Sequence, residues 1–147
     1  MKRIATHAAV AAIASFVTYL AIAPDSLWTS AHAQAQPTGV KQTELFKTTM
    51  SDVMGRVFSV RVLERDAGTG SPAHRHPGSH TVGYILEGAY EVKIDDGPVK
   101  KLGPGETFYE APNALHAVSR NGSKTAPVKY LVIQVSDPTK PATVAAE

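Results

Sequence analysis

The chain has 147 residues, of which 43% are hydrophobic and 19% are charged, as in an ordinary globular protein. Its 15 Lys and Arg residues nearly balance 13 Asp and Glu residues, and no basic patch stands out, so nucleic acid is not an expected partner. The absence of Cys excludes disulfides, thiolate nucleophiles, a lipoprotein anchor and Cys-bound zinc. Any metal site must therefore use His, carboxylates and water.

The N-terminal segment has the order of a secretory signal peptide. A basic start at Lys2 and Arg3 precedes an uncharged apolar run over residues 8–23. Residues 31–33 then read Ala-His-Ala, the small-x-small pattern of a cleavage site. The apolar run is about 16 residues long, which is short for a membrane-spanning helix of about 20. We therefore expect residues 1–33 to be a cleaved signal peptide, with an uncleaved anchor or a buried helix as alternatives.

This expectation places the mature protein in the periplasm or outside the cell, without stable membrane association after cleavage. The mature chain begins with a polar stretch over residues 34–43, which we expect to be a flexible lead-in. About 110 residues remain after removal of the signal peptide, enough for one modest hydrophobic core.

The rest of the mature chain has the pattern of short strands separated by turns. Tyr90, Val92 and Ile94 alternate with charged residues, and the Asp-Asp-Gly-Pro turn at 95–98 makes this strand part of a hairpin. No amphipathic helix and no repeat is apparent. This pattern predicts an all-β sandwich or closed barrel over residues 44–137, followed by a frayed C-terminal tail over 138–147. The expected strands cover residues 58–62, 82–86, 90–94, 99–102, 107–109, 115–119 and 128–135.

Four histidines of the mature chain are the candidate metal ligands: His74, His76, His80 and His116. Residues at i and i+2 of a strand point to the same face, so His74 and His76 can offer their imidazoles to one ion. Neutral imidazole suits divalent transition metals, and three such ligands leave positions open for water or substrate. A His-x-His pair by itself is more often a polar surface loop, so the surrounding pattern has to decide.

That pattern resembles the two motifs of the cupin superfamily, in particular its small single-barrel, quercetin-dioxygenase-like members. The first motif spans Gly68–Gly88 and contains His74 and His76; the second spans Gly105–Asn121 and contains His116. The resemblance implies a single jelly-roll β-barrel that holds a metal ion on these three histidines. An unrelated β-sandwich with a fortuitous histidine loop is the alternative.

The first motif lacks its usual Glu, which is the fourth ligand in the family. Counting from the two ends of the motif places either Thr81 or His80 at that position. Imidazole binds such metals far better than a neutral hydroxyl, so we expect His80 to be the fourth ligand, with a bulge near Gly83 absorbing one extra residue. Outer-shell and solvent-exposed positions of His80 are the alternatives. Asn113 replaces the usual Gly of the second motif, which Asn can do because it tolerates positive φ.

The resemblance implies one divalent transition metal ion, Fe, Mn, Ni, Cu or Zn, that acts on a small organic molecule. Dioxygenase-like, isomerase and lyase chemistry all remain open, because one fold serves many reactions. A non-catalytic periplasmic protein that binds a metal or small ligand is the alternative, and a homodimer is compatible with both. Glu110, the carboxylate nearest the second motif, is better interpreted as a solvated edge residue than as a general base.

Overall fold

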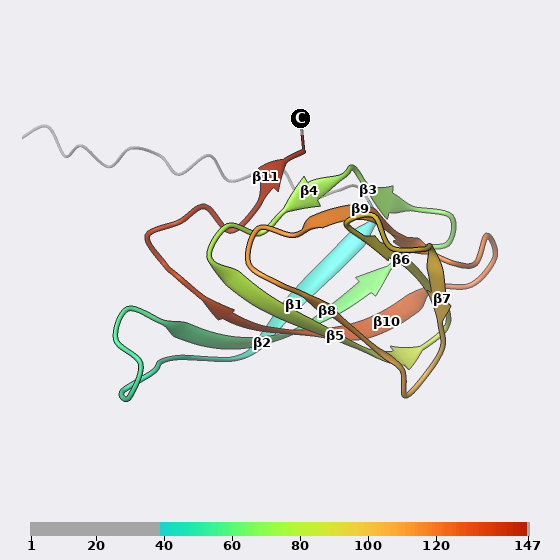
Figure 1. Cartoon of the computed structure of the whole chain (residues 1–147). Coiled ribbons are helices and arrows are strands. Elements are labelled where there is room, and N and C mark those ends of the chain that lie inside the picture. The colour runs from blue at the N-terminus through green and yellow to red at the C-terminus, as the bar shows by residue number, and fades with distance from the viewer. Residues whose placement is uncertain (1–38, 147) are drawn as a thin grey trace, which may run out of the picture.

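The computed structural model describes residues 39–146, which form two β-sheets packed face to face (Figure 1). No helix occurs within this range, and so none that is long and apolar enough to span a membrane. The predicted all-β jelly roll is therefore confirmed as a sandwich of two sheets. The strands of the first sheet are β1 (Val40–Thr49), β2 (Val57–Arg65), β5 (Ser79–Glu87), β8 (Thr107–Glu110) and β10 (Val128–Ser136). Those of the second are β3 (Gly70–Ser71), β4 (His74–Arg75), β6 (Tyr90–Ile94), β7 (Lys100–Leu102), β9 (Leu115–Asn121) and β11 (Val144–Ala145).

Both sheets are antiparallel, and their strand order brings distant parts of the chain together. The first sheet has the order β1-β2-β10-β5-β8. The second has the order β11-β4-β9-β6-β7, and β3 pairs with β9 beside β4. In this second sheet His74 lies directly opposite His116. The pairing of β4 with β9 therefore brings His74 of the first motif next to His116 of the second motif.

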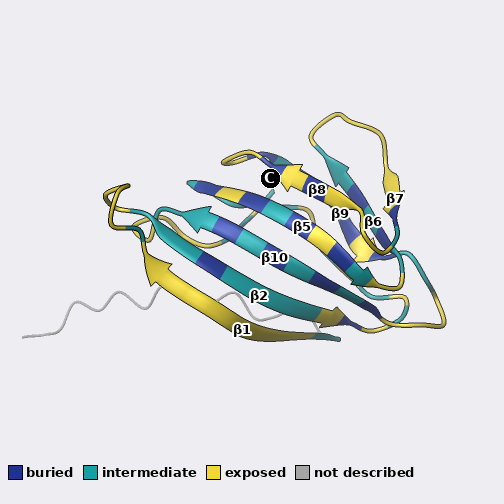
Figure 2. Ribbon diagram, turned by 90° about the horizontal axis from the view of Figure 1, so that it is seen from below, coloured by how far each residue is buried: buried dark blue, intermediate teal, exposed yellow. Residues whose placement is uncertain are grey.

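The core lies between the sheets and follows the period of two expected for strands. Buried and less buried residues alternate along β5 and β10, as the colour bands of Figure 2 show. Aromatic rings fill the centre: Tyr90 packs on Phe108 and Tyr130 with ring centroids 5.4 Å and 4.7 Å apart. Each fully buried large apolar side chain contributes about 1.5–3 kcal/mol. The core consists of Ile85, Tyr90, Val92, Leu102, Phe108, Val128, Tyr130 and Val132.

Gly83 allows the ring of Phe108 to pack closely on the backbone of β5, and the bulge expected near Gly83 is not there. β5 pairs with β10 in unbroken register through Gly83, and the irregularity lies further on, between Ile85 and Glu87. A Cβ atom at Gly83 would lie 2.0 Å from the Phe108 ring. Glycine is therefore required at this position because the ring packs directly on the backbone.

All seven predicted strands are present, but both ends of the described chain are more ordered than expected. β1 begins at Val40, inside the stretch expected to be a flexible lead-in, and pairs with β2 along its length. β11 lies in the expected tail and pairs with β4, where Ala145 is opposite His74. The predicted signal peptide, residues 1–33, lies outside the described residues.

Candidate metal centre

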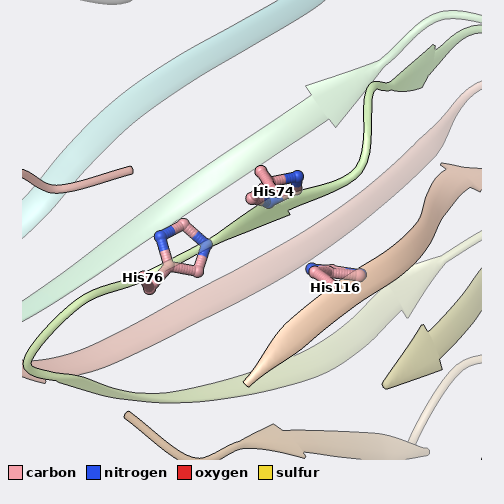
Figure 3. Close-up of side chains that lie close together, drawn as sticks. All are labelled: His74, His76 and His116. Carbon is pink, nitrogen blue, oxygen red and sulfur yellow. The ribbon is translucent and has the colours of Figure 1, made fainter. Parts of the chain in front are cut away.

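His74, His76 and His116 converge on one point between the sheets (Figure 3). His74 is on β4, His76 directly follows this strand, and His116 is on the neighbouring strand β9. One ring nitrogen from each histidine lies within 4.8 Å of the other two. Nitrogen atoms at such separations can all bind one ion, since metal–nitrogen distances are about 2.0–2.1 Å for zinc.

Backbone carbonyls fix the tautomers of two of these histidines. His74 Nδ1 lies 2.8 Å from the Pro72 carbonyl oxygen, and His76 Nδ1 lies 2.6 Å from that of Ala142. A carbonyl oxygen only accepts, so Nδ1 carries the proton and donates in both cases. The Nε2 lone pair of each ring is thus left available as a ligand, the arrangement that usually orients metal-binding histidines.

His116 is the most buried member of the cluster, and its Nε2 has no hydrogen-bond partner among the described residues. Only 3% of the residue is exposed, and its Nδ1 lies 3.2 Å from Glu110 Oε1. Leaving a buried polar atom unpaired costs about 1–3 kcal/mol. Coordination of a metal ion by His116 Nε2 would remove this cost, so the donor set fits a divalent transition metal.

Glu110, at the end of β8, brings a carboxylate to the histidines. Its Oε1 lies 3.2 Å from His116 Nδ1, and its Oε2 lies 3.9 Å from His76 Nε2. Only 2% of Glu110 is exposed, so its interpretation as a solvated edge residue is wrong. Burial raises the pKa of this carboxyl group, but contact with His116 and the nearby His76 and His74 outweighs burial and lowers the pKa below its ordinary value. Glu110 is therefore a buried carboxylate of the site.

His80 does not join the cluster, which corrects the expectation of a fourth histidine ligand. The residue is exposed, its ring stacks on Tyr109, and its Nδ1 lies 2.7 Å from the Tyr109 hydroxyl. Thr81, which has 2% exposure, takes the inward position and accepts a hydrogen bond of 2.9 Å from Gln134 Nε2. Successive residues of a strand point to opposite faces, so His80 and Thr81 cannot both face the cluster.

The environment of His74 disfavours its charged form. Burial is the largest effect and lowers the pKa of His74 to about 4, with smaller contributions in the same direction from His116 and His76. The hydrogen bond to Pro72 acts in the opposite sense. In the metal-free protein His74 is consequently neutral at pH 7 and keeps a lone pair for a metal.

The cluster opens into a cavity of about 370 Å³ between the sheets, a volume typical of sites for small molecules. Its wall includes Arg61 and Arg65 of β2, which the sequence analysis missed. Phe58, Val60 and Val62 alternate with polar or charged residues in β2, a local pattern that does not point to Arg61 and Arg65 as cavity residues. The cavity also contacts the C-terminal segment through Thr143 and Ala145, which closes one side of the site.

Asn113 stands in the turn before β9, where the second cupin motif usually has a Gly. It has φ of 65°, the left-handed conformation for which Asn is a suitable replacement of Gly. Its backbone N–H donates to the His76 carbonyl oxygen at 3.1 Å. The turn therefore ties the start of β9, and with it His116, to the segment that carries His76.

The comparisons with known proteins agree with this fold. The family model of the Cupin domain matches residues 61–134, half of the chain. The DMSP lyase DddQ from Ruegeria pomeroyi is 26% identical with a TM-score of 0.52, and the match covers 60% of this chain but only 43% of the lyase. KdgF from Halomonas sp. is 20% identical with a TM-score of 0.56, covering 71% of this chain and 85% of that one.

A conserved protein with a double-stranded β-helix domain from Klebsiella pneumoniae has the same fold, with 18% identity and a TM-score of 0.57. That match covers 77% of this chain and 89% of the Klebsiella protein. No curated protein sequence matches the chain significantly. The family match spans both histidine motifs and the strands that bring them together, and the chain therefore belongs to the cupin family.

Proposed function

We propose that this protein binds one divalent transition metal ion through His74, His76 and His116, with Glu110 as the carboxylate of the site, and acts on a small organic molecule in the adjoining cavity. The observation that carries the proposal is the convergence of three histidines whose ring nitrogens lie within 4.8 Å of one another. Two further observations support the same conclusion: the tautomers of His74 and His76 are fixed, and His116 Nε2 has no hydrogen-bond partner among the described residues.

A bound metal would act as a Lewis acid that polarises an oxygen atom of the substrate. The chain's own residues supply the rest of the site. Glu110 balances positive charge and, with a buried oxygen atom that has no hydrogen-bond partner among the described residues, can accept a proton from a substrate. Tyr90, Phe108 and Tyr130 give part of the cavity wall an apolar, aromatic surface.

The similarity to a DMSP lyase favours an enzyme. The position of Thr81, where the family usually has a Glu ligand, favours the second candidate, a non-catalytic protein that binds a metal or small ligand. Glu110 weakens that argument because it supplies a carboxylate from the neighbouring strand. We therefore favour a metal-dependent cupin enzyme, in which lyase, isomerase and dioxygenase-like reactions are the candidate chemistries.

Metal titration of untagged protein that starts at Gln34 tests the proposal. We expect one ion per chain, with affinity lost in His74→Ala, His76→Ala and His116→Ala. His80→Ala is the matched control, because it removes an exposed histidine of the same segment. Stoichiometric metal at unchanged affinity in His116→Ala would overturn the site. A metal-loaded protein that binds small molecules without converting any of them would support the binding protein instead.

We also propose that the protein is exported and acts in the periplasm or outside the cell. The basic start, the short apolar run and the Ala-His-Ala sequence at 31–33 support this proposal. Mass spectrometry of protein from the extracytoplasmic fraction should find an N-terminus near Gln34. Recovery of the full-length chain in the inner membrane would contradict cleavage.

A further inference from the structure

Two arginines of β2 give the cavity wall a positive charge that the metal ligands do not explain. Arg61 and Arg65 are four residues apart on the same face of the strand, and both line the cavity. Arg65 is only 2% exposed. Arginine is almost never buried so completely without a partner that neutralises its charge.

Neither guanidinium has such a partner among the described residues. Arg65 Nη2 donates to the Ser71 hydroxyl at 2.8 Å, and Arg61 Nη2 donates to the Gln134 side-chain oxygen; both acceptors are neutral. Three further nitrogens are buried and have no hydrogen-bond partner in the described part of the chain: Arg65 Nε, Arg65 Nη1 and Arg61 Nε. Burial lowers the pKa of Arg61, although Glu44 on the neighbouring strand raises it. Within residues 39–146 the two arginines thus form no ion pair, and some of their buried N–H groups have no acceptor there.

The cavity as a whole is electrostatically unbalanced. Among the described residues, the formally charged ones that line it are Arg61, Arg65 and Glu110, so one carboxylate faces two guanidiniums; Glu44, opposite Arg61 on β1, lies outside the lining. Glu110 is already engaged with the histidines at 3.2 and 3.9 Å. A divalent ion at the histidines would increase the positive excess further. An unpaired buried charge is costly, which indicates that an anionic ligand completes the site.

We propose that the substrate is a small organic carboxylate, whose carboxylate group binds at the wall formed by Arg61 and Arg65 while a second oxygen atom reaches the metal. This inference rests on the proposed metal site for the second contact only. A guanidinium matches the planar two-oxygen geometry of a carboxylate, and such charge-assisted hydrogen bonds are about twice as strong as neutral ones. The cavity volume of about 370 Å³ limits the ligand to a small molecule.

Calorimetric titration of matched acids and amides tests the proposal. The probes are glycolate, 3-hydroxypropionate and 4-hydroxybutyrate, each compared with its neutral primary amide and with inorganic phosphate, in zinc-loaded and in metal-free protein. We expect at least one acid to bind about tenfold or more tightly than its amide, equivalent to about 1.4 kcal/mol. Arg65→Gln and Arg61→Gln should abolish this preference without changing zinc affinity. Arg120→Gln, which removes an exposed arginine paired with Glu91, should not.

The outcomes separate this inference from the metal proposal. Equal binding of acids and amides, or an unchanged preference in both arginine variants, would overturn the carboxylate even if zinc binds as proposed. If phosphate binds more tightly than every acid, the proposed carboxylate substrate is wrong and the arginines bind a phosphate group instead. A preference that depends on Arg65 in metal-free protein would support the inference even if the metal site fails.

The variant Arg65→Met distinguishes a ligand-binding role of Arg65 from a purely structural one. Arg65→Met should lose the acid preference while unfolding at the same temperature or higher, because it removes an unpaired buried charge. A lower unfolding temperature together with unchanged acid binding would identify Arg65 as a purely structural group and overturn its assignment. Arg65→Lys serves if the Gln and Met variants do not fold, since it keeps the charge and should retain part of the preference.

Discussion

Thr81 on β5 and Glu110 on β8 lie directly opposite each other, and each is only 2% exposed. The position that usually carries the carboxylate of the first cupin motif is thus occupied by a hydroxyl, while a carboxylate projects from the adjacent strand. Cβ atoms of directly opposed residues are about 4.5–5.5 Å apart, so a carboxylate can change strands and remain in the same site. Glu110 is the sole carboxylate of the cavity lining among the residues that the structure describes.

Glu110→Gln should weaken metal binding about 10- to 100-fold, the range seen when groups that orient or support metal ligands are removed. The amide keeps the size of the side chain but loses its negative charge. Calorimetric competition with a chelator measures the change. Glu87→Gln is the control, because Glu87 is an exposed residue of β5. Equal metal affinity in the two variants would show that the Glu110 carboxylate has no part in the site.

Thr81→Glu should destabilise the metal-free protein by about 1–3 kcal/mol at pH 7, although it restores the residue usual in the motif. The new carboxylate would face Glu110 across the strand pair, and the hydrogen bond from Gln134 to the Thr81 hydroxyl would be lost. Denaturant unfolding measures this loss. Adding Glu110→Gln should recover most of it, because only one carboxylate then remains. Thr107→Glu, at an exposed position of β8, controls for the addition of a Glu.

The free energy of unfolding of the metal-free protein should fall as the pH decreases from about 6.5 to about 4, because His74 takes up a proton more readily in the unfolded chain than in the folded protein. The pKa of His74 is about 4 in the folded state, against 6.5 as its ordinary value. Between these values the unfolded chain binds more protons, so a decrease in pH favours unfolding, and the effect levels off below about pH 4. Denaturant unfolding at several pH values should show a shallower dependence for His74→Gln. An identical slope in both proteins would contradict the lowered pKa.

His80→Glu should leave metal affinity unchanged within about twofold, since the side chain lies on the exposed face of β5. The loss of its contact with Tyr109 should cost less than about 1 kcal/mol of stability, as is typical for exposed polar interactions. Metal titration and thermal unfolding measure the two effects. A metal affinity that rises or falls tenfold would mean that His80 reaches the ion.

Gly83→Ala should cost about 1–3 kcal/mol, because the added methyl group would lie 2.0 Å from the buried ring of Phe108. Thermal and denaturant unfolding provide the measurement. Gly103→Ala is the control, since the nearest atom to its added Cβ is 3.7 Å away at the end of the Glu106 side chain. Phe108→Leu should partly rescue Gly83→Ala by making room for the methyl group, which a purely backbone effect would not permit.

The local pattern of this sequence predicts its strands because alternation and turn residues are local properties. Tyr90, Val92 and Ile94, with the turn at 95–98, indicated a hairpin without any knowledge of distant contacts, and β6 and β7 confirm it. The i, i+2 spacing of His74 and His76, and the motif that carries His116, likewise predicted three residues that the fold brings together. The spacing of a motif thus identified the histidine cluster.

Other features depended on which strands become neighbours, and this is decided by packing of the two sheets. His80 was the better ligand by chemistry, but the β5 alternation that buries Ile85 turns Thr81 inward and His80 outward. The role of Glu110 depends on the pairing of β8 with β5. The charged wall exists because the face of β2 that carries Arg61 and Arg65 is the one turned toward the cavity. The sequence by itself therefore determined the all-β fold and the three histidines. Only the tertiary structure decided the source of the carboxylate and the charge of the cavity, because both follow from the side of each strand that faces the other sheet.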